Sequence, residues 1–132
     1  RLVGSEMCIR DRGGTVSDTQ KDLHRKLLGR KGEKLVCEYL KKQGYKLIKT
    51  NLRTRYGEAD VVCEKNGVTV FVEVKTRSGD RFGTPAEAVD GRKRERYRKI
   101  ALDFLAREGE RQISFAVAEV TDERVRLIEN AF

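Results

Sequence analysis

Two charged residues, Glu73 and Lys75, stand two positions apart in the stretch GVTVFVEVKTRSG, residues 67–79. Their neighbours are β-branched and aromatic residues, which predict a β-strand over Val68–Val74. Because side chains on a strand alternate between its two faces, Glu73 and Lys75 are expected on one face and the valines on the other. Charges on a mostly apolar strand cost free energy unless other groups compensate them, so this pair is a candidate for chemistry.

A third candidate, Asp60, lies on the preceding predicted strand, Glu58–Glu64, which an Asn-Gly pair at 66–67 connects to the next strand. Asn-Gly signals a tight β-hairpin, and folding the hairpin about it places Asp60 opposite Glu73. Two adjacent carboxylates repel unless a cation lies between them, and carboxylates with water are typical Mg²⁺ ligands. A lysine beside them can orient or deprotonate a water, or stabilise charge on a phosphate. The set therefore predicts metal-assisted phosphodiester hydrolysis.

A simpler interpretation of Glu73 and Lys75 is an exposed ion pair on the solvated face of a sheet, since surface ion pairs are common and weak. Glu58 shares the predicted face of Asp60 and fits either a supporting acid or a charge at a strand edge. The chain has one histidine, His24, so a hydrolase triad built on an activated serine or cysteine is not supported.

Signals for helices and strands alternate along the chain and define the elements that position these residues. The expected elements are a helix over Lys21–Gln43, a strand over Tyr45–Asn51, a basic loop over 52–57, the two hairpin strands, a helical region from a capping box at Thr84 to about Arg107 with a break near Gly91, and strands over Ile113–Val120 and 124–129. The order αβββαββ predicts an α/β fold with one mixed sheet and helices on its faces.

The chain of 132 residues suits a single domain, expected over residues 21–132. Residues 1–20 show no periodicity and are expected to be a disordered or extraneous leader. The cysteines, Cys8, Cys37 and Cys63, are odd in number and form no C-x-x-C pair, which favours a reducing, cytoplasmic compartment over disulfides or zinc. No apolar run reaches the length of a membrane span, so no membrane partner is expected.

The charge balance of the chain is strongly basic, with 29 Lys and Arg against 21 Asp and Glu. Such a balance favours a polyanionic partner, nucleic acid above all, although basic runs on helices are often solvated faces. No helix-turn-helix or zinc-finger pattern is present, so base-specific recognition is not predicted. Tyr97, within the basic run of the second helix, fits either stacking on a base or packing in the core. The candidate nucleic-acid contacts lie in the basic loop, after the third strand and in the second helix: Arg53, Arg55, Arg77, Arg92, Lys93 and Arg94.

Three segments carry a closer resemblance: GRKGEKLVCEYLKKQGYKLIKTNLRTRYGEADVV, VFVEVKTRSGDRFGTPAEAVDGRK and the ending LIENAF. Over about residues 29–132 the chain resembles the bacterial YraN-like family. That family belongs to the restriction-endonuclease-like, or PD-(D/E)xK, superfamily and is similar to archaeal Holliday junction resolvases. The resemblance implies a restriction-endonuclease-like, three-layer α/β/α sandwich with a central mixed sheet, a nuclease-type site that uses Mg²⁺ or, in its place, Mn²⁺, and a homodimer.

The family's motifs match this chain at particular positions. Asp60 and Glu73 match the metal-binding acids, and Lys75 matches the lysine of the E-x-K motif. Glu33, in the first helix, matches an acid that some members of the superfamily add to the site, although the sequence alone equally allows a solvated helix residue. Ala116 stands where the family usually has an aspartate, so an acid that supports the site or the sheet edge is in doubt.

The leading expectation is a metal-dependent, nuclease-like protein that hydrolyses phosphodiesters in structured or branched DNA, with DNA preferred to RNA. The alternative is a non-catalytic nucleic-acid-binding module that kept the nuclease fold and acts as a partner in recombination or DNA processing. A plain interaction protein, which binds neither nucleic acid nor metal, is a third class.

Overall fold

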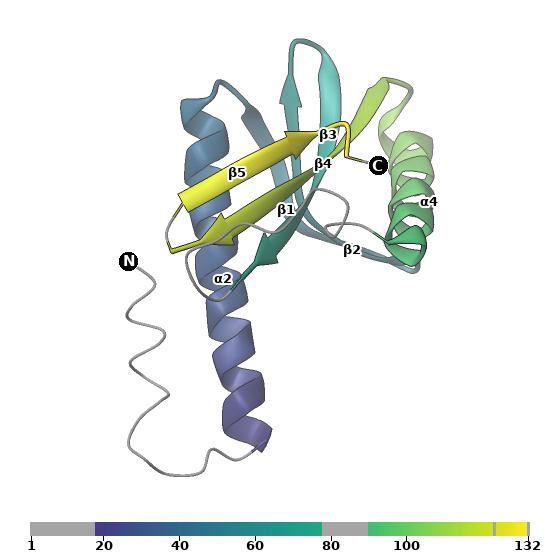
Figure 1. Cartoon of the computed structure of the whole chain (residues 1–132). Coiled ribbons are helices and arrows are strands. Elements are labelled where there is room, and N and C mark those ends of the chain that lie inside the picture. Colours follow the sequence, from purple (N-terminus) through teal and green to yellow (C-terminus); the bar gives the residue numbers. More distant parts are fainter. Residues whose placement is uncertain (1–17, 78–89, 123, 132) are drawn as a thin grey trace.

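A computed structural model describes the backbone of residues 18–77, 90–122 and 124–131, and within these ranges the side chains from Arg30 onward. Figure 1 shows the helices and strands of the described residues. In chain order they are α2 (Asp18–Lys42), β1 (Lys46–Thr54), β2 (Gly57–Lys65), β3 (Val68–Thr76), α4 (Gly91–Glu108), β4 (Gln112–Thr121) and β5 (Arg124–Glu129). Residues 18–20 therefore belong to α2, and the rest of the predicted leader lies outside the described ranges.

The five strands form one mixed sheet in the order β1-β2-β3-β4-β5. Neighbouring strands are antiparallel except β3 and β4, which are parallel and have α4 between them in the sequence. A parallel pair needs such a crossover connection, because its strands run in the same direction. The predicted α/β class with a mixed sheet is thus confirmed.

The β2–β3 hairpin turns at Asn66 and Gly67, whose φ angles are 53° and 79°. Positive φ at both central residues is what a two-residue type I′ turn requires. The paired residues run from Lys65↔Val68 to Val61↔Val72, which is the register that the Asn-Gly signal predicts.

The two helices cover opposite faces of the sheet, as Figure 1 shows. Val36 and Leu40 of α2 are fully buried against valines and alanines of β2, β3 and β4. On the other face, Tyr97 and Phe104 of α4 pack on Phe71 of β3, with the Phe71 and Phe104 rings edge to face at 5.4 Å. In the described part of the chain, neither helix has an apolar stretch long enough to cross a bilayer.

The β1 strand runs three residues beyond its predicted end at Asn51, so the expectation of a loop starting at residue 52 is wrong. Arg53 lies in the strand opposite Glu58, and its Nε is 3.0 Å from the Glu58 carboxylate. The Thr54 hydroxyl donates to the Gly57 carbonyl and accepts from the Tyr56 N–H, which closes a short turn. These contacts extend the β1–β2 hairpin through residues whose polarity had suggested a loop.

Helix α4 begins at Gly91, the position where the sequence indicated a break. The Asp90 side chain caps it by accepting a hydrogen bond from the Lys93 backbone N at 2.9 Å. This backbone hydrogen bond lowers the pKa of Asp90 below its usual value, with smaller contributions from nearby charges. The predicted capping box at Thr84 lies outside the described residues.

Gly32 marks a close approach of α2 to the sheet, because a Cβ atom there would lie 2.3 Å from the Thr76 Oγ1 of β3. Replacing a helical glycine by alanine ordinarily stabilises a protein by about 1 kcal/mol. Here the added methyl group collides with Thr76, so we expect Gly32→Ala to lower the free energy of unfolding by about 1–3 kcal/mol in a denaturant titration. Adding Thr76→Ala removes the obstructing hydroxyl and should recover most of that loss; an unchanged deficit would contradict the steric explanation.

Candidate functional site

Asp60 lies where β2 and β3 separate. The ladder of paired residues ends at Val61↔Val72, and Asp60 Oδ2 accepts a hydrogen bond from the Val74 backbone N at 2.8 Å. The carboxylate thus bridges the two strands just beyond their last pair. It is close enough to Glu73 for the two charges to repel, so the structure brings together the two acids that the hairpin register predicted.

The environment of Asp60 disfavours its charged form and raises its pKa to about 7. Burial is the largest cause, and repulsion from Glu73 is the second. The hydrogen bond from Val74 opposes the shift, while Glu33 and Glu58 add to it. A carboxylate with this pKa lies in a site that favours a bound proton or another cation.

Glu73 is buried on the α4 face of the sheet and is 7% exposed. The Tyr97 hydroxyl donates to its Oε1 at 2.5 Å, and the Lys93 Nζ is 2.6 Å from its Oε2. Arg96 lies further away, with a nitrogen 3.9 Å from Oε1. The simpler interpretation, an exposed ion pair of Glu73 with Lys75, is therefore wrong, because α4 covers and binds this carboxylate.

Glu33 of α2 lies close enough to Glu58 and Glu73 for their charges to act on it. Burial raises its pKa, and repulsion from Glu58 and Glu73 adds to the rise. A hydrogen bond with the Asn51 side chain and the charge of Arg30 oppose it. Asn51 itself has a positive φ of 52° within β1. The structure thus supports a place for Glu33 near the other acids over a fully solvated position on the helix.

Lys75 follows Glu73 on β3, is half-buried and is in register with Glu119 of β4. Strand alternation gives Lys75 the same face as Glu73. Arg77, a predicted nucleic-acid contact, donates from its Nε to the Glu119 carboxylate at 2.6 Å. Lys75 and Arg77 thus follow Glu73 at the C-terminal end of β3, next to Glu119 of β4.

Sequence reasoning missed how α4 holds the site. Tyr97 is fully buried, so the alternative in which it stacks on a base is wrong and packing in the core is confirmed. No pattern in the sequence indicates that Arg96 lies near Glu73 or that the Asn51 side chain hydrogen-bonds Glu33. The spacing of Lys93 and Tyr97 is one pattern that predicts a shared contact, because residues four positions apart lie on the same face of a helix.

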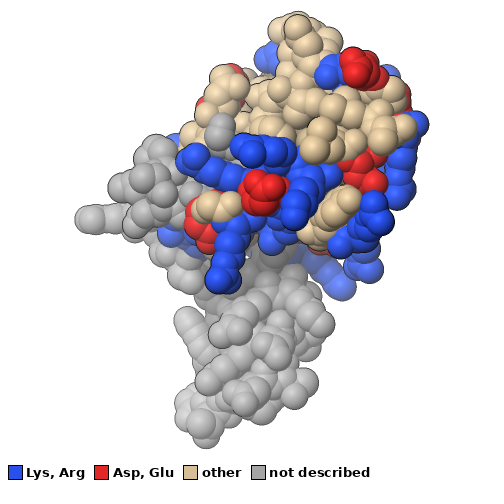
Figure 2. Space-filling view, turned by 90° about the vertical axis from the view of Figure 1, so that its right-hand side faces the viewer, with Lys and Arg blue, Asp and Glu red and all other residues tan. Residues whose placement is uncertain are grey.

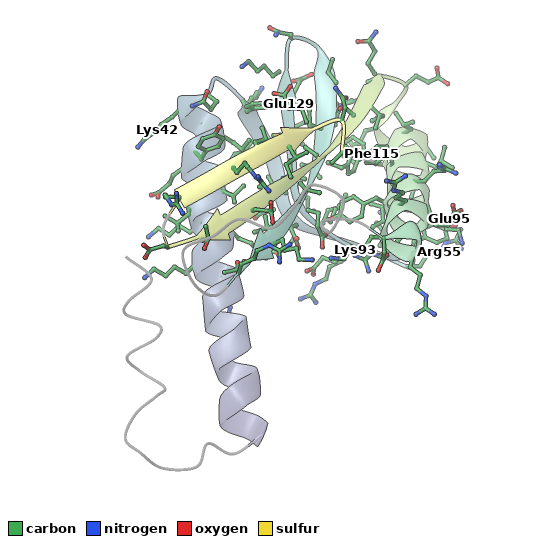
Figure 3. The ribbon with its side chains drawn as sticks, viewed as in Figure 1. Lys42, Arg55, Lys93, Glu95, Phe115 and Glu129 are labelled. Atoms are coloured by element: carbon green, nitrogen blue, oxygen red, sulfur yellow. The ribbon has the colours of Figure 1, made fainter. Side chains whose placement is uncertain are left out.

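Basic side chains gather on the side of the molecule that α4 occupies, as Figure 2 shows. Arg55, Arg92 and Arg94 are exposed there, in the β1–β2 turn and the first turn of α4. Arg53 is also exposed but is bound to Glu58, and Lys93 is bound to Glu73. Figure 3 places Arg55 and Lys93 at the same end of the molecule. Exposed arginines around an acidic centre fit the approach of a phosphate backbone.

The Tyr97 hydroxyl also accepts a long hydrogen bond, 3.4 Å, from the Asp60 backbone N, so it connects both acids. We expect Tyr97→Phe to lower the free energy of unfolding by about 1–3 kcal/mol, because it removes a hydrogen-bond donor from a buried carboxylate. Urea titration at neutral pH measures the change. Tyr39 of α2 is half-buried, and Tyr39→Phe is the matched control for loss of a tyrosine hydroxyl. Equal stability of the Tyr97→Phe variant and the wild type would contradict the role given to this hydroxyl.

The acids can be tested for their fit to the metal ion that the resemblance implies. Among the described residues, no group of three or more His, Cys, Asp or Glu side chains is arranged as a metal cluster. Asp60 and Glu73 together offer carboxylate oxygens, and a bound cation would offset the repulsion that helps to raise the pKa of Asp60. Mg²⁺ binds through one or two carboxylates and keeps several waters, so the pair fits this ion.

Ala116 faces away from the candidate site. It is 1% exposed, lies in the core beneath α2 and is in register with Val72. Glu73 lies on the opposite face of the sheet, against α4. An aspartate at position 116 would therefore point away from Glu73, and the alanine removes no acid from that face.

The described residues form an α/β protein with a five-stranded mixed sheet and two helices, in which Asp60 lies near Glu73 where β2 and β3 separate. The chain belongs to the uncharacterised protein family UPF0102, whose family model matches residues 32–128. The expected membership of the YraN-like family is thereby confirmed.

Relatives in this family match nearly their whole length. A UPF0102 protein of Alkaliphilus metalliredigens (strain QYMF) is 42% identical over 112 residues, covering 81% of this chain and 98% of the relative. A UPF0102 protein of Syntrophomonas wolfei is 46% identical over 111 residues, covering 80% and 96%. UPF0102 protein STH1475 of Symbiobacterium thermophilum is 45% identical over 112 residues, covering 80% and 95%.

Proposed function

We propose that this protein hydrolyses phosphodiester bonds in structured or branched DNA with the help of Mg²⁺ or Mn²⁺. The observation that carries the proposal is the proximity of the Asp60 and Glu73 carboxylates on β2 and β3, with a smaller electrostatic contribution from Glu33 of α2 and with Lys75 on the face of Glu73. Like charges gathered in a partly buried place favour a cation, and the basic surface around them favours a polyanion.

We also assign the chain to the restriction-endonuclease-like fold. Support comes from the mixed sheet between α2 and α4 and from the positions of the acids on adjacent strands. Asp60 ends the paired part of β2, and Glu73 and Lys75 lie on the neighbouring β3. This arrangement is the one that the resemblance implies for a nuclease-type site.

In the proposed reaction, Asp60 and Glu73 hold the metal ion, which when bound supplies a polarised water and positive charge for the phosphate. Lys75 orients the attacking water or stabilises the negative charge that develops on the phosphate oxygens. Glu33 approaches from α2 and holds a water by hydrogen bonding. Arg55, Arg92 and Arg94 bind the flanking phosphates and fix the position of the DNA.

The contacts of Glu73 favour a second candidate, a non-catalytic nucleic-acid-binding module. Both of its carboxylate oxygens are engaged by α4, one by Tyr97 and one by Lys93. A metal ion bound by Glu73 has to share or replace the Lys93 ammonium, whereas a module that only binds nucleic acid needs no such change.

Purified protein incubated with a four-way DNA junction, and with linear duplex of the same sequence, tests the proposal. We expect cleavage of the junction in Mg²⁺ or Mn²⁺ that stops when EDTA removes the metal. Tight, salt-dependent binding without metal-stimulated cleavage would support the second candidate. A protein that neither binds nor cleaves DNA would contradict both.

A further inference from the structure

A second group of charged side chains lies on the sheet face that carries Glu73. Lys75 of β3 is in register with Glu119 of β4, which is in register with Arg126 of β5. In the next row, Thr121 of β4 is in register with Arg124 of β5, and Arg77 follows the end of β3. Alternation places these side chains on one face, because the residues between them pack in the core beneath α2.

Glu119 is the centre of this group and is fully buried. Its carboxylate accepts hydrogen bonds from Arg77 Nε, at 2.6 Å, and from a terminal nitrogen of Arg126. Burial alone raises the pKa of Glu119, but the two guanidinium groups outweigh it and hold that pKa below its usual value. Glu119 therefore stays ionised at neutral pH and fixes both arginines in place.

The arginines are held at the sheet but remain open to solvent. The side chains of Arg77 and Arg126 are 24% and 35% exposed, and Arg124 is exposed. Arg77 Nη2 and Arg126 Nε are buried, so the N–H donors left for the oxygens of a phosphate are those on the exposed part of each guanidinium. Within the described residues, these two rows carry four cations, Lys75, Arg77, Arg124 and Arg126, and one acid, Glu119, with Glu73 before them on β3 and Asp122 after them in the β4–β5 turn.

A purely structural role explains less of this arrangement. A buried ion pair contributes little net stability, because desolvation offsets much of the attraction. Glu119 is bound by two arginines, Arg77 and Arg126, and the two rows add Lys75 and Arg124. The surplus of cations next to the candidate site is what a polyanion-binding surface requires.

We propose that Arg77, Arg124 and Arg126, positioned by Glu119, bind phosphates of the DNA backbone on the β5 side of the acids. This inference rests on the proposed function and extends it. The arginines near α4 lie on one side of Asp60 and Glu73, and this group lies on the other side. Adjacent strands are about 4.8 Å apart, so the row from Lys75 to Arg126 spans about 10 Å. That length matches about three successive nucleotides of one DNA strand.

Fluorescence anisotropy of a labelled four-way junction, without metal, tests this surface through binding. The test variant is Arg124→Gln/Arg126→Gln, and the single variant Arg124→Gln removes one exposed positive charge while Arg126 stays on Glu119. The matched control is Lys41→Gln/Lys42→Gln, which removes the same charge at the C-terminal end of α2. Figure 3 shows Lys42 at the end of the molecule away from Lys93 and Arg55.

We expect the double arginine variant to bind at least about tenfold more weakly and to lower the slope of log affinity against log salt by about 1–2. The single variant should show about half of this change in slope, and the lysine control little. Equal binding by the arginine variants and the lysine control overturns the inference, as does a wild type that binds no DNA. If the wild type binds DNA through these arginines but does not cleave it in Mg²⁺, the proposed reaction is refuted and the DNA-binding role of these arginines is supported.

Discussion

Replacement of Asp60 by asparagine is expected to reduce metal-dependent DNA cleavage by at least about 100-fold, since it removes a metal ligand while keeping the size of the side chain. The carbonyl oxygen of the introduced amide can still accept the hydrogen bond from Val74 that Asp60 Oδ2 accepts in the wild type. The fold should therefore survive, and the loss should lie in metal binding and turnover. A junction-cleavage assay in Mg²⁺, with folding checked by circular dichroism, measures it.

The same substitution has a second expected effect, on stability and its dependence on pH. The folded-state pKa of Asp60 is raised from 3.8 to about 7, so the folded protein holds a proton that the unfolded chain has released. Wild-type stability should therefore fall as pH rises from about 4 through about 7. Each pKa unit corresponds to about 1.4 kcal/mol. Because Asp60 titrates together with Glu73, we expect the free energy of unfolding to fall by about 1–4 kcal/mol over this pH range.

Asp60→Asn removes this titration, so its stability relative to the wild type should increase between pH 5 and pH 8. Asp103→Asn, in the last turns of α4, is the matched control, because Asp103 pairs with Arg107 away from the acids. Urea titrations of the three proteins at both pH values give the comparison. If the difference in free energy of unfolding between Asp60→Asn and the wild type is the same at both pH values, Asp60 has an ordinary pKa.

Replacement of Lys75 by glutamine is expected to slow cleavage by about 100- to 10,000-fold, the range in which a positioned acid–base group contributes. Lys75 lies two residues from Glu73 and on the same face of β3, so the effect should fall on the chemical step. Saturating the protein with DNA separates cleavage from binding. Mn²⁺ affinity, measured by calorimetry, should change far less than the cleavage rate.

Lys42→Gln provides the control for loss of one positive charge, since Lys42 is exposed at the end of α2. Its cleavage rate should equal that of the wild type. Full activity in the Lys75→Gln variant would remove this lysine from the mechanism. A loss of activity that strong DNA excess restores would instead assign Lys75 to substrate binding.

The local part of the site could be predicted from the sequence because it depends on short-range geometry. An Asn-Gly turn fixes the register of two adjacent strands, and strand alternation fixes the face of each residue. These two rules suffice to bring Asp60 beside Glu73. Hydrophobic periodicity similarly predicted α2 to within three residues at its start and one at its end.

The contacts between distant elements could not be predicted in the same way. Lys93 and Tyr97 reach Glu73 only because α4 packs on Phe71, which depends on the three-dimensional fit of side chains far apart in the chain. The extension of β1 to Thr54 depends on the Arg53–Glu58 pair, which residue polarity alone does not reveal. Glu119 lies in an apolar stretch, and its arginine partners come from the residue after β3 and from β5.

A crystal grown or soaked with Mn²⁺ tests the central claim most directly, because anomalous scattering locates that ion independently of any assay. We expect an anomalous peak between the Asp60 and Glu73 carboxylates, with Lys93 displaced from Glu73 or sharing it with the ion. Absence of the peak at saturating Mn²⁺, with Glu73 still held by Lys93 and Tyr97 as it is here, would contradict a metal-dependent site.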